Sequence, residues 1–211
     1  VAARLGDQYM SVECGLISSC HLPSEKQFNF SLMLDDIGIF FDTEHRSRLE
    51  MILDHGFGAQ TNAITARARS FREQVVTNDI TKYNNAPRMV LPPRDERHRI
   101  LVIDQTSGDL SLTYGQTEKY SFADMLEHAV AREGAEVFLK PHPETLAGAK
   151  GANYDIEALR RRNDVTVIEE PCNIMSLLHQ VDEVYVMVSG VGFEALMADK
   201  TVRCFGVPFY A

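Results

Sequence analysis

The chain has 211 residues, and its 21 basic and 30 acidic side chains give a formal charge of −9 at pH 7. This balance argues against a general nucleic-acid binder, which needs a basic surface to neutralise phosphates. No apolar run approaches the roughly 18 residues of a bilayer-spanning helix. Four cysteines without a C-x-x-C pair fit a cytoplasmic chain with reduced thiols, and peripheral attachment to a membrane stays open.

The first part of the chain has an irregular pattern. Gly38–Phe41 predicts a strand, residues 46–55 and 62–77 predict helices, and the Asp35-Asp36 pair before Gly38 predicts a turn. The proline-bearing stretch 84–97 is the best linker candidate. Residues 1–85 hold too few strands for a complete α/β domain, so we expect 1–97 to be part of a domain followed by a linker.

From residue 98 onward, short β-rich runs alternate with helical patterns. The expected strands are 99–103, 135–139, 165–168, 184–188 and 202–205. The expected helices are 121–133, 153–163, 173–180 and one through 194–197. Repeated βα units of this length predict a parallel sheet with helices on both faces over residues 98–211.

Three polar clusters follow predicted strands, and ligands in open parallel sheets bind beyond the carboxyl ends of the strands. The clusters are Asp104-Gln105-Thr106, Lys140-Pro141-His142-Pro143 and Ser189 through Glu194. Asp104 allows two interpretations: a turn residue, or a carboxylate that acts as nucleophile or base. The prolines restrict Lys140 and His142 to extended backbone, and an ammonium and an imidazole held there suit a phosphate. The alternative interpretation is an ordinary exposed turn.

The third cluster leaves a strand and opens a helix. Its glycines let a ligand approach the backbone, and free amides at a helix start attract an anion. Ser189 adds a hydroxyl, and Glu194 is a candidate for hydrogen bonds to a ribose. Gly190-x-Gly192-x-x-Ala195 formally matches a dinucleotide fingerprint. We reject NAD, because the acidic residue expected about 20 positions further on is missing. The sequence contains no zinc-type ligand spacing and no serine-hydrolase elbow.

Several segments, in order along the chain, resemble the KpsC/LipB family of bacterial capsule polysaccharide biosynthesis proteins, most closely its amino-terminal catalytic module. They are Val12-Glu13-Cys14-Gly15, Asp35 through Asp42, Lys82-Tyr83-Asn84, Val102 through Thr106, Lys140 through Pro143, Ser189 through Leu196, and Gly206 through Ala211. Cys14 and Leu16 differ from the family's Glu-Asp-Gly-Phe segment. The family continues beyond Ala211, so we expect the chain to be incomplete.

This resemblance implies a GT-B-like fold with two Rossmann-like domains. Residues 98–211 would bind the nucleotide sugar, and 1–97 would be part of the acceptor-side domain with the linker. The implied activity is transfer of Kdo from CMP-Kdo, with retention, to build a β-Kdo linker on a phosphatidylglycerol lipid. Asp104 would be the nucleophile and Glu13 the acid/base for the acceptor hydroxyl.

The same resemblance assigns the remaining site residues. Lys140, His142, Ser189, Gly190 and Gly192 would hold the leaving CMP phosphate. Glu194 would contact the ribose, with Gln105 and Thr106 in support.

The expected partners are the CMP-sugar donor, a lipid-linked Kdo acceptor and capsule assembly proteins, without a metal or other cofactor. The expected location is the cytoplasm, or the inner face of its membrane. Three alternatives stay open: a CDP-glycerol-type polymer transferase, a non-catalytic CMP-binding module, and an α/β domain without a nucleotide site.

Overall fold

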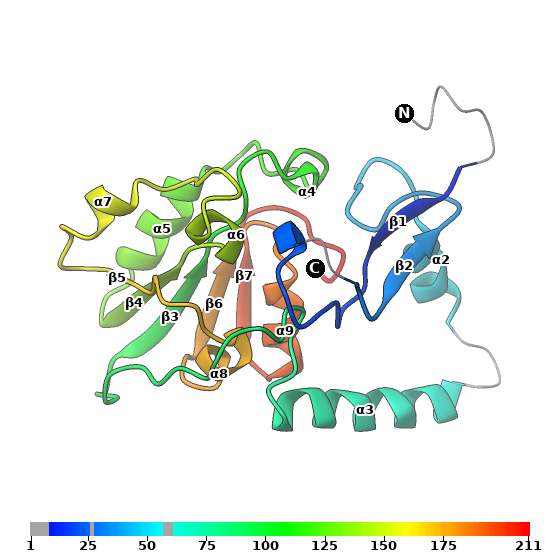
Figure 1. The fold of residues 1–211 in the computed structure, drawn as a ribbon, viewed down its shortest axis with the longest axis horizontal. Helices are drawn as coiled ribbons and strands as arrows, with labels where there is room; N and C mark the ends of the chain where they lie inside the picture. The colour runs from blue at the N-terminus through cyan, green and yellow to red at the C-terminus, as the bar shows by residue number, and fades with distance from the viewer. Residues whose placement is uncertain (1–8, 26–27, 57–60) are drawn as a thin grey trace.

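The computed structural model describes residues 9–25, 28–56 and 61–211. A five-stranded parallel sheet forms the larger part, and a two-stranded antiparallel sheet stands apart from it near the N-terminus (Figure 1). The α/β prediction is confirmed. Within the described ranges, no helix combines the length and hydropathy that crossing a bilayer demands.

The parallel sheet has the strand order β5-β4-β3-β6-β7. Its strands are β3 (His98–Ile103), β4 (Ala135–Lys140), β5 (Thr166–Val167), β6 (Glu183–Val186) and β7 (Thr201–Cys204). The chain moves outward from β3 to β5, and then returns to the other side of β3 to form β6 and β7. The strand order therefore reverses between β3 and β6, and such a switch point is where open α/β sheets form their ligand crevice.

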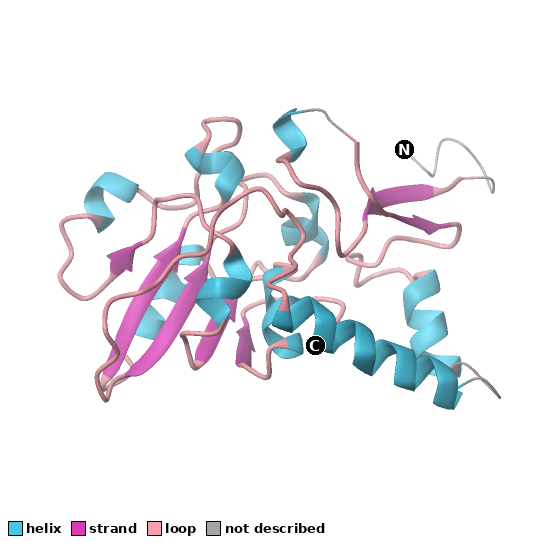
Figure 2. Cartoon of the chain, turned by 60° about the horizontal axis from the view of Figure 1, so that its bottom comes forward, coloured by secondary structure: helices cyan, strands magenta, loops and turns pink. Residues whose placement is uncertain are grey.

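Helices cover both faces of this sheet (Figures 1 and 2). On one face, α5 (Phe122–Val130) and α7 (Ile156–Leu159) pack against alternate residues of β3, β4 and β6 such as Ile100 and Tyr185. On the other, α8 (Ile174–Leu178) and α9 (Val191–Met197) pack against the intervening residues, such as Leu101 and Val184. Two short helices, α4 (Leu110–Tyr114) and α6 (Pro143–Leu146), follow the carboxyl ends of β3 and β4.

The N-terminal part pairs β1 (Ser11–Cys14) with β2 (Leu32–Asp35), and Cys14 lies opposite Leu32. The short 3-10 helix η1 (Pro23–Glu25) lies between these strands in the chain, and α2 (Arg48–His55) and α3 (Thr61–Thr77) follow them. Val75 and Leu91 belong to the core under α8 and α9. The packed core therefore crosses residue 97, and the division at 97/98 stays a prediction.

The predicted strand at Gly38–Phe41 is wrong. One carboxylate oxygen of Asp35 accepts hydrogen bonds from the amides of Ile37 (2.8 Å) and Gly38 (2.9 Å), which makes the expected turn and removes two donors that a strand would need. Phe40 instead packs edge-on against Phe209 near the other end of the chain. The strands β1 and β2 were not predicted.

Most predicted helices are present, and side-chain caps set their starts. Ser47 and Ser121 form capping boxes with the residues three positions on, and Asn173 caps α8. Asp155 caps α7, so this helix begins later than the predicted residue 153, and it ends at Leu159. The helix predicted over 121–133 ends at Val130, before Gly134 with its positive φ of 70°.

Candidate functional site

Asp104 lies directly after β3, at the point where the strand order reverses. Its side chain is only 1% exposed. Its Oδ1 accepts hydrogen bonds from the Gln105 amide (2.9 Å) and from Asn153 Nδ2 (2.9 Å). Its Oδ2 has no hydrogen-bond partner among the described residues. The carboxylate is therefore fixed through Oδ1, while Oδ2 is buried without a hydrogen-bond partner in the described ranges.

Burial raises the pKa of the Asp104 carboxyl, and hydrogen bonds from Asn153 and from the Gln105 amide oppose this effect in part. Buried polar atoms without a partner are rare because each costs free energy. A buried carboxylate with one free oxygen at the switch point is the arrangement expected of a group that acts on a ligand.

Gln105 ties the ends of β3 and β6 together. Its side-chain oxygen accepts a hydrogen bond from the Val188 amide (2.9 Å), just after β6. The carbonyl of Thr106 accepts from the Asp109 amide (3.3 Å) in the turn before α4. The bond to Val188 ties the segment after Asp104 to the end of β6, so a supporting role for Gln105 has a geometric basis. The role of Thr106 toward a ligand stays a prediction.

Lys140 closes β4, and its carbonyl accepts a hydrogen bond from the Asp104 amide (3.1 Å). Its ammonium group donates to the carbonyls of Ile168 (3.0 Å) and Glu170 (3.0 Å), in the segment after β5. Burial lowers the pKa of Lys140. Two of its three donors are therefore bound within the protein, and phosphate binding by Lys140 stays a prediction.

His142 is the N-cap of α6, and its Nδ1 accepts a hydrogen bond from the Glu144 amide (3.2 Å). Burial lowers the pKa of His142 to about 4, so the ring is neutral at pH 7. With Nδ1 accepting, the remaining proton sits on Nε2. His142 therefore offers a ligand one neutral hydrogen-bond donor rather than a positive charge.

Ser189 and Gly190 lie in the loop from β6 into α9, and Gly192 lies in the first turn of α9. The Ser189 carbonyl accepts hydrogen bonds from the Gly192 amide (3.0 Å) and from the Tyr210 hydroxyl. A Cβ atom on Gly192 would collide with the Tyr210 ring, whereas a Cβ atom on Gly190 would meet open space. Packing against Tyr210 thus requires glycine at 192. Packing does not require glycine at position 190, and the open space beside Gly190 leaves room for a ligand.

Glu194 lies on α9 and is only 3% exposed. Its Oε1 accepts hydrogen bonds from the Thr81 hydroxyl and from the Lys82 amide (3.0 Å). Burial raises the pKa of the Glu194 carboxyl. Glu194 therefore holds the segment after α3 against α9, and its predicted contact with a ribose is untested.

Glu13 lies on β1, where successive side chains point to opposite faces. It lines a groove of about 210 Å³ together with Ile39, Phe40 and Leu49. Its neighbour Cys14 accepts a hydrogen bond from Asn29 Nδ2 (3.5 Å). No recorded contact among the described residues joins Glu13 to Asp104, and its acid/base role stays a prediction.

Sequence reasoning gave no role to two residues of this edge. Asn153 holds Asp104, and no motif marked it. Lys82 belongs to the segment Lys82-Tyr83-Asn84, which resembles the family, and this motif could have marked it as a site residue. Burial works to lower the pKa of Lys82, but Tyr83 and Cys14 outweigh it and raise the pKa. Lys82 in turn adds to the lowering of the pKa of His142, so it places a cation near that ring.

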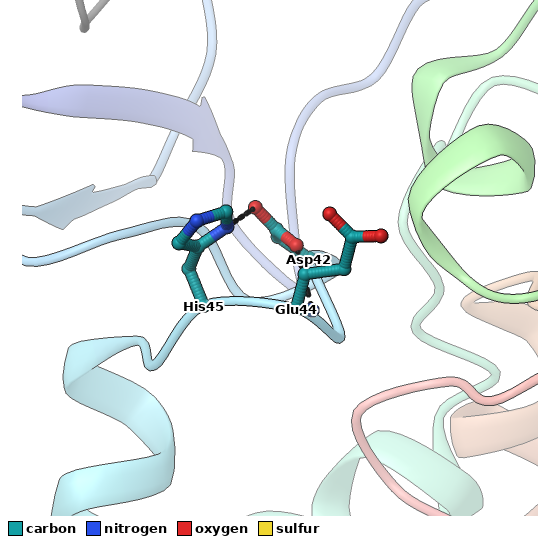
Figure 3. Close-up of side chains that lie close together, drawn as sticks. All are labelled: Asp42, Glu44 and His45. Atoms are coloured by element: carbon teal, nitrogen blue, oxygen red, sulfur yellow. Dashed lines mark hydrogen bonds and ion pairs between the residues drawn. The ribbon is translucent and has the colours of Figure 1, made fainter.

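A separate acidic cluster lies in the loop before α2 (Figure 3). Asp42, Glu44 and His45 hold possible ligand atoms within 4.8 Å of one another. Asp42 already accepts from the Glu44 amide (2.9 Å) and pairs with His45 Nδ1 (3.0 Å). Glu44 and His45 are exposed, and these internal hydrogen bonds explain the grouping without an ion.

Two solved structures share this fold. A Thermosulfurimonas dismutans KpsC described as a beta Kdo 2,4 transferase superposes with a TM-score of 0.84 at 34% identity, covering 97% of this chain and 63% of that one. A beta Kdo 2,7 transferase form of KpsC from the same organism gives a TM-score of 0.71 at 29% identity, covering 96% of this chain and 58% of that one. The fold is therefore GT-B-like, as predicted.

Curated relatives agree with these structures. The capsule polysaccharide modification protein LipA of Neisseria meningitidis serogroup A is 33% identical over 96% of this chain, which spans 29% of LipA. The lipopolysaccharide-processing protein LpsZ of Rhizobium meliloti is 34% identical over 95% of this chain, which spans 46% of LpsZ. A family profile described as capsule polysaccharide biosynthesis protein matches residues 73–211. The chain thus belongs to the capsule polysaccharide biosynthesis protein family and is of the KpsC/LipB type.

Proposed function

We propose that this chain carries the catalytic carboxylate of a Kdo glycosyltransferase that uses CMP-Kdo with retention of configuration. The observation that carries the proposal is Asp104, a buried carboxylate with one free oxygen at the switch point of the sheet. The likeness to two KpsC structures described as beta Kdo transferases supports the choice of sugar.

In the proposed first step, the Asp104 carboxylate attacks the anomeric carbon of Kdo, and the bond from this carbon to the phosphate oxygen breaks. CMP leaves with the bonding electron pair, and the sugar is held as an ester of Asp104. The Nε2–H group of His142, the Ser189 hydroxyl and the Gly190 amide are the proposed donors to the phosphate. Lys140, Gly192 and Glu194 would complete the nucleotide site.

In the second step, the acceptor hydroxyl attacks the same carbon from the opposite face, and the bond to Asp104 breaks. Glu13 is proposed to take the hydroxyl proton. Two inversions at one carbon give net retention, which is why the mechanism needs a carboxylate nucleophile. No metal enters the proposal, so excess EDTA should leave transfer unchanged.

The proposed acceptor is a β-Kdo residue on a phosphatidylglycerol lipid, which places the reaction at the inner face of the cytoplasmic membrane with other capsule assembly proteins. The better superposition on the 2,4 transferase, with a TM-score of 0.84 against 0.71, favours a 2,4 linkage over a 2,7 linkage. NMR analysis of the product on a soluble β-Kdo acceptor distinguishes the two linkages.

The decisive experiment compares the wild type with Asp104→Asn in CMP-Kdo and a β-Kdo acceptor. Wild type should release CMP and extend the acceptor. Asp104→Asn should do neither while it remains folded, because its side-chain oxygen can still accept from Gln105 and Asn153. Unchanged turnover in the variant would remove Asp104 from the mechanism.

Two further arms separate the alternatives. Turnover of CDP-glycerol in place of CMP-Kdo indicates the polymer transferase. CMP binding in calorimetry, without CMP release from CMP-Kdo, indicates a non-catalytic module.

A further inference from the structure

Asn153 lies in the loop between α6 and α7, far along the chain from Asp104. Its Nδ2 donates to Asp104 Oδ1 (2.9 Å) and to the carbonyl of Gln105 (2.5 Å). Both partners are acceptors, so the amide nitrogen must face them and the assignment of its two ends is settled by the network. A single side chain thus bridges the nucleophile and the backbone that follows it.

The loop that carries Asn153 is fixed on both sides. The Gly151 carbonyl accepts from the Ser107 amide (3.1 Å), beyond Gln105 in the chain. On the other side, Tyr154 is buried, and its hydroxyl donates to the Phe122 carbonyl (2.7 Å) at the start of α5. These anchors limit the movement of Asn153 relative to Asp104.

The two oxygens of Asp104 are chemically equivalent in a free carboxylate, but they are not equivalent here. Two N–H groups bind Oδ1, and Oδ2 has no partner in the described part of the chain. Hydrogen bonds stabilise negative charge on the oxygen that accepts them. Oδ1 is therefore the held oxygen, and Oδ2 is the more nucleophilic one.

We propose that Asn153 is a positioning residue that holds Asp104 through Oδ1 and so selects Oδ2 as the oxygen that forms the bond to the sugar. This inference rests on the proposed function. Within it, Oδ2 attacks the anomeric carbon and CMP departs with the electron pair. In this proposal Asn153 contacts neither the sugar nor CMP, and it acts only through Asp104.

The second consequence concerns ionisation, because only an ionised carboxylate attacks. Burial raises the pKa of Asp104, and Asn153 is the strongest group opposing that rise. In the described part of the chain, the titratable groups near this position are Tyr154, whose pKa is raised by burial, and His142, whose pKa is lowered by burial to about 4. Both are neutral at pH 7, and the Lys140 ammonium is bound to carbonyls of another loop.

A direct test measures the titration of Asp104 by ¹³C carboxyl NMR, which needs no activity. Asn153→Ala removes the donor, and loss of a hydrogen bond to a charged group should raise the pKa of Asp104 by about 1. Asn153→Asp has the same shape but adds a like charge, and it should raise this pKa further. Asp104→Asn assigns the signal, and circular dichroism checks the fold of every variant.

The inference is supported if the pKa of Asp104 rises from the wild type to Asn153→Ala and rises again in Asn153→Asp. An Asp104 pKa that is the same in all three proteins overturns it. If Asn153→Ala fails to fold, Asn153→Asp alone decides, since it fills the same space.

The kinetic test follows the pH profile of CMP release from CMP-Kdo. The acid limb of kcat should move upward with the Asp104 pKa in Asn153→Ala, while KM for the donor stays unchanged. An unmoved limb overturns the inference even if the rate falls. A wild type that binds CMP but never consumes CMP-Kdo overturns the proposed function instead, and the NMR titration distinguishes the two failures.

Discussion

Gly192→Ala should destabilise the protein strongly, although the substitution adds only one methyl group. The new Cβ atom would lie under 3.0 Å from the hydroxyl oxygen and two ring carbons of Tyr210, which is closer than van der Waals contact allows. Tyr210 cannot move freely, because its hydroxyl donates to the Ser189 carbonyl and its ring packs edge-on against Phe209, with centroids 5.1 Å apart. The substitution therefore displaces the ring and breaks the hydrogen bond.

The expected cost has two parts. Overpacking costs about 1–3 kcal/mol, and loss of the hydrogen bond from Tyr210 adds about 1 kcal/mol. A chain of this size loses about 2–4 °C in Tm per kcal/mol, so Gly192→Ala should lower Tm by roughly 5–15 °C. Gly190→Ala is the matched control. A Cβ atom there meets nothing within 4 Å, and the backbone at φ −58° and ψ −20° is helical, so Tm should barely change.

Differential scanning calorimetry of five proteins checks this reasoning: the wild type, Gly190→Ala, Gly192→Ala, Tyr210→Ala and the double variant Gly192→Ala/Tyr210→Ala. The double variant removes the ring that causes the collision, so its loss of stability should be smaller than the sum of the two single losses. Equal Tm values for the two glycine variants would refute the packing argument. Additive losses in the double variant would place the cause outside the contact with Tyr210.

The remaining predictions concern buried charges. Burial raises the pKa of Asp104 in the folded protein above its ordinary value. Ionisation of this group therefore lowers stability as the pH rises through the raised pKa, and in thermal melts the Tm of Asp104→Asn should gain on that of the wild type with rising pH. Glu194→Ala leaves the Thr81 hydroxyl and the Lys82 amide without their acceptor and should cost about 1–3 kcal/mol in urea unfolding, while Glu194→Gln, which keeps one oxygen, should cost less. Lys140→Met should cost about 1–3 kcal/mol in the same assay by leaving two carbonyls unpaired, and an unchanged unfolding midpoint would contradict a structural role for its ammonium.

The parallel sheet could be predicted because its signals are local. Strand-forming runs of four or five residues alternate with helical patterns, and Ser121 and Asn173 begin helices where the sequence places them. The wrong strand at Gly38–Phe41 has a different origin. Its apolar residues pack on the distant Phe209, and the hydrogen bonds of Asp35 to the following amides compete with strand formation.

The three polar clusters could also be placed at one edge of the sheet from sequence, since the carboxyl ends of parallel strands meet there. The sequence could not say which atoms are free. The Lys140 ammonium turns to carbonyls 28 and 30 residues away, and Glu194 binds Thr81 across 113 residues. Hydrogen bonds of such separation depend on how the segments pack, and no local pattern encodes them.

By itself, the sequence determined the βα order and the family, because apolar runs, helical periodicity and motif order are local features of the chain. Only the tertiary structure decided that Asp104 keeps one oxygen free, that Asn153 holds the other across 49 residues, and that His142 is neutral. These properties depend on burial and on partners from distant segments, and both exist only once the segments have packed together.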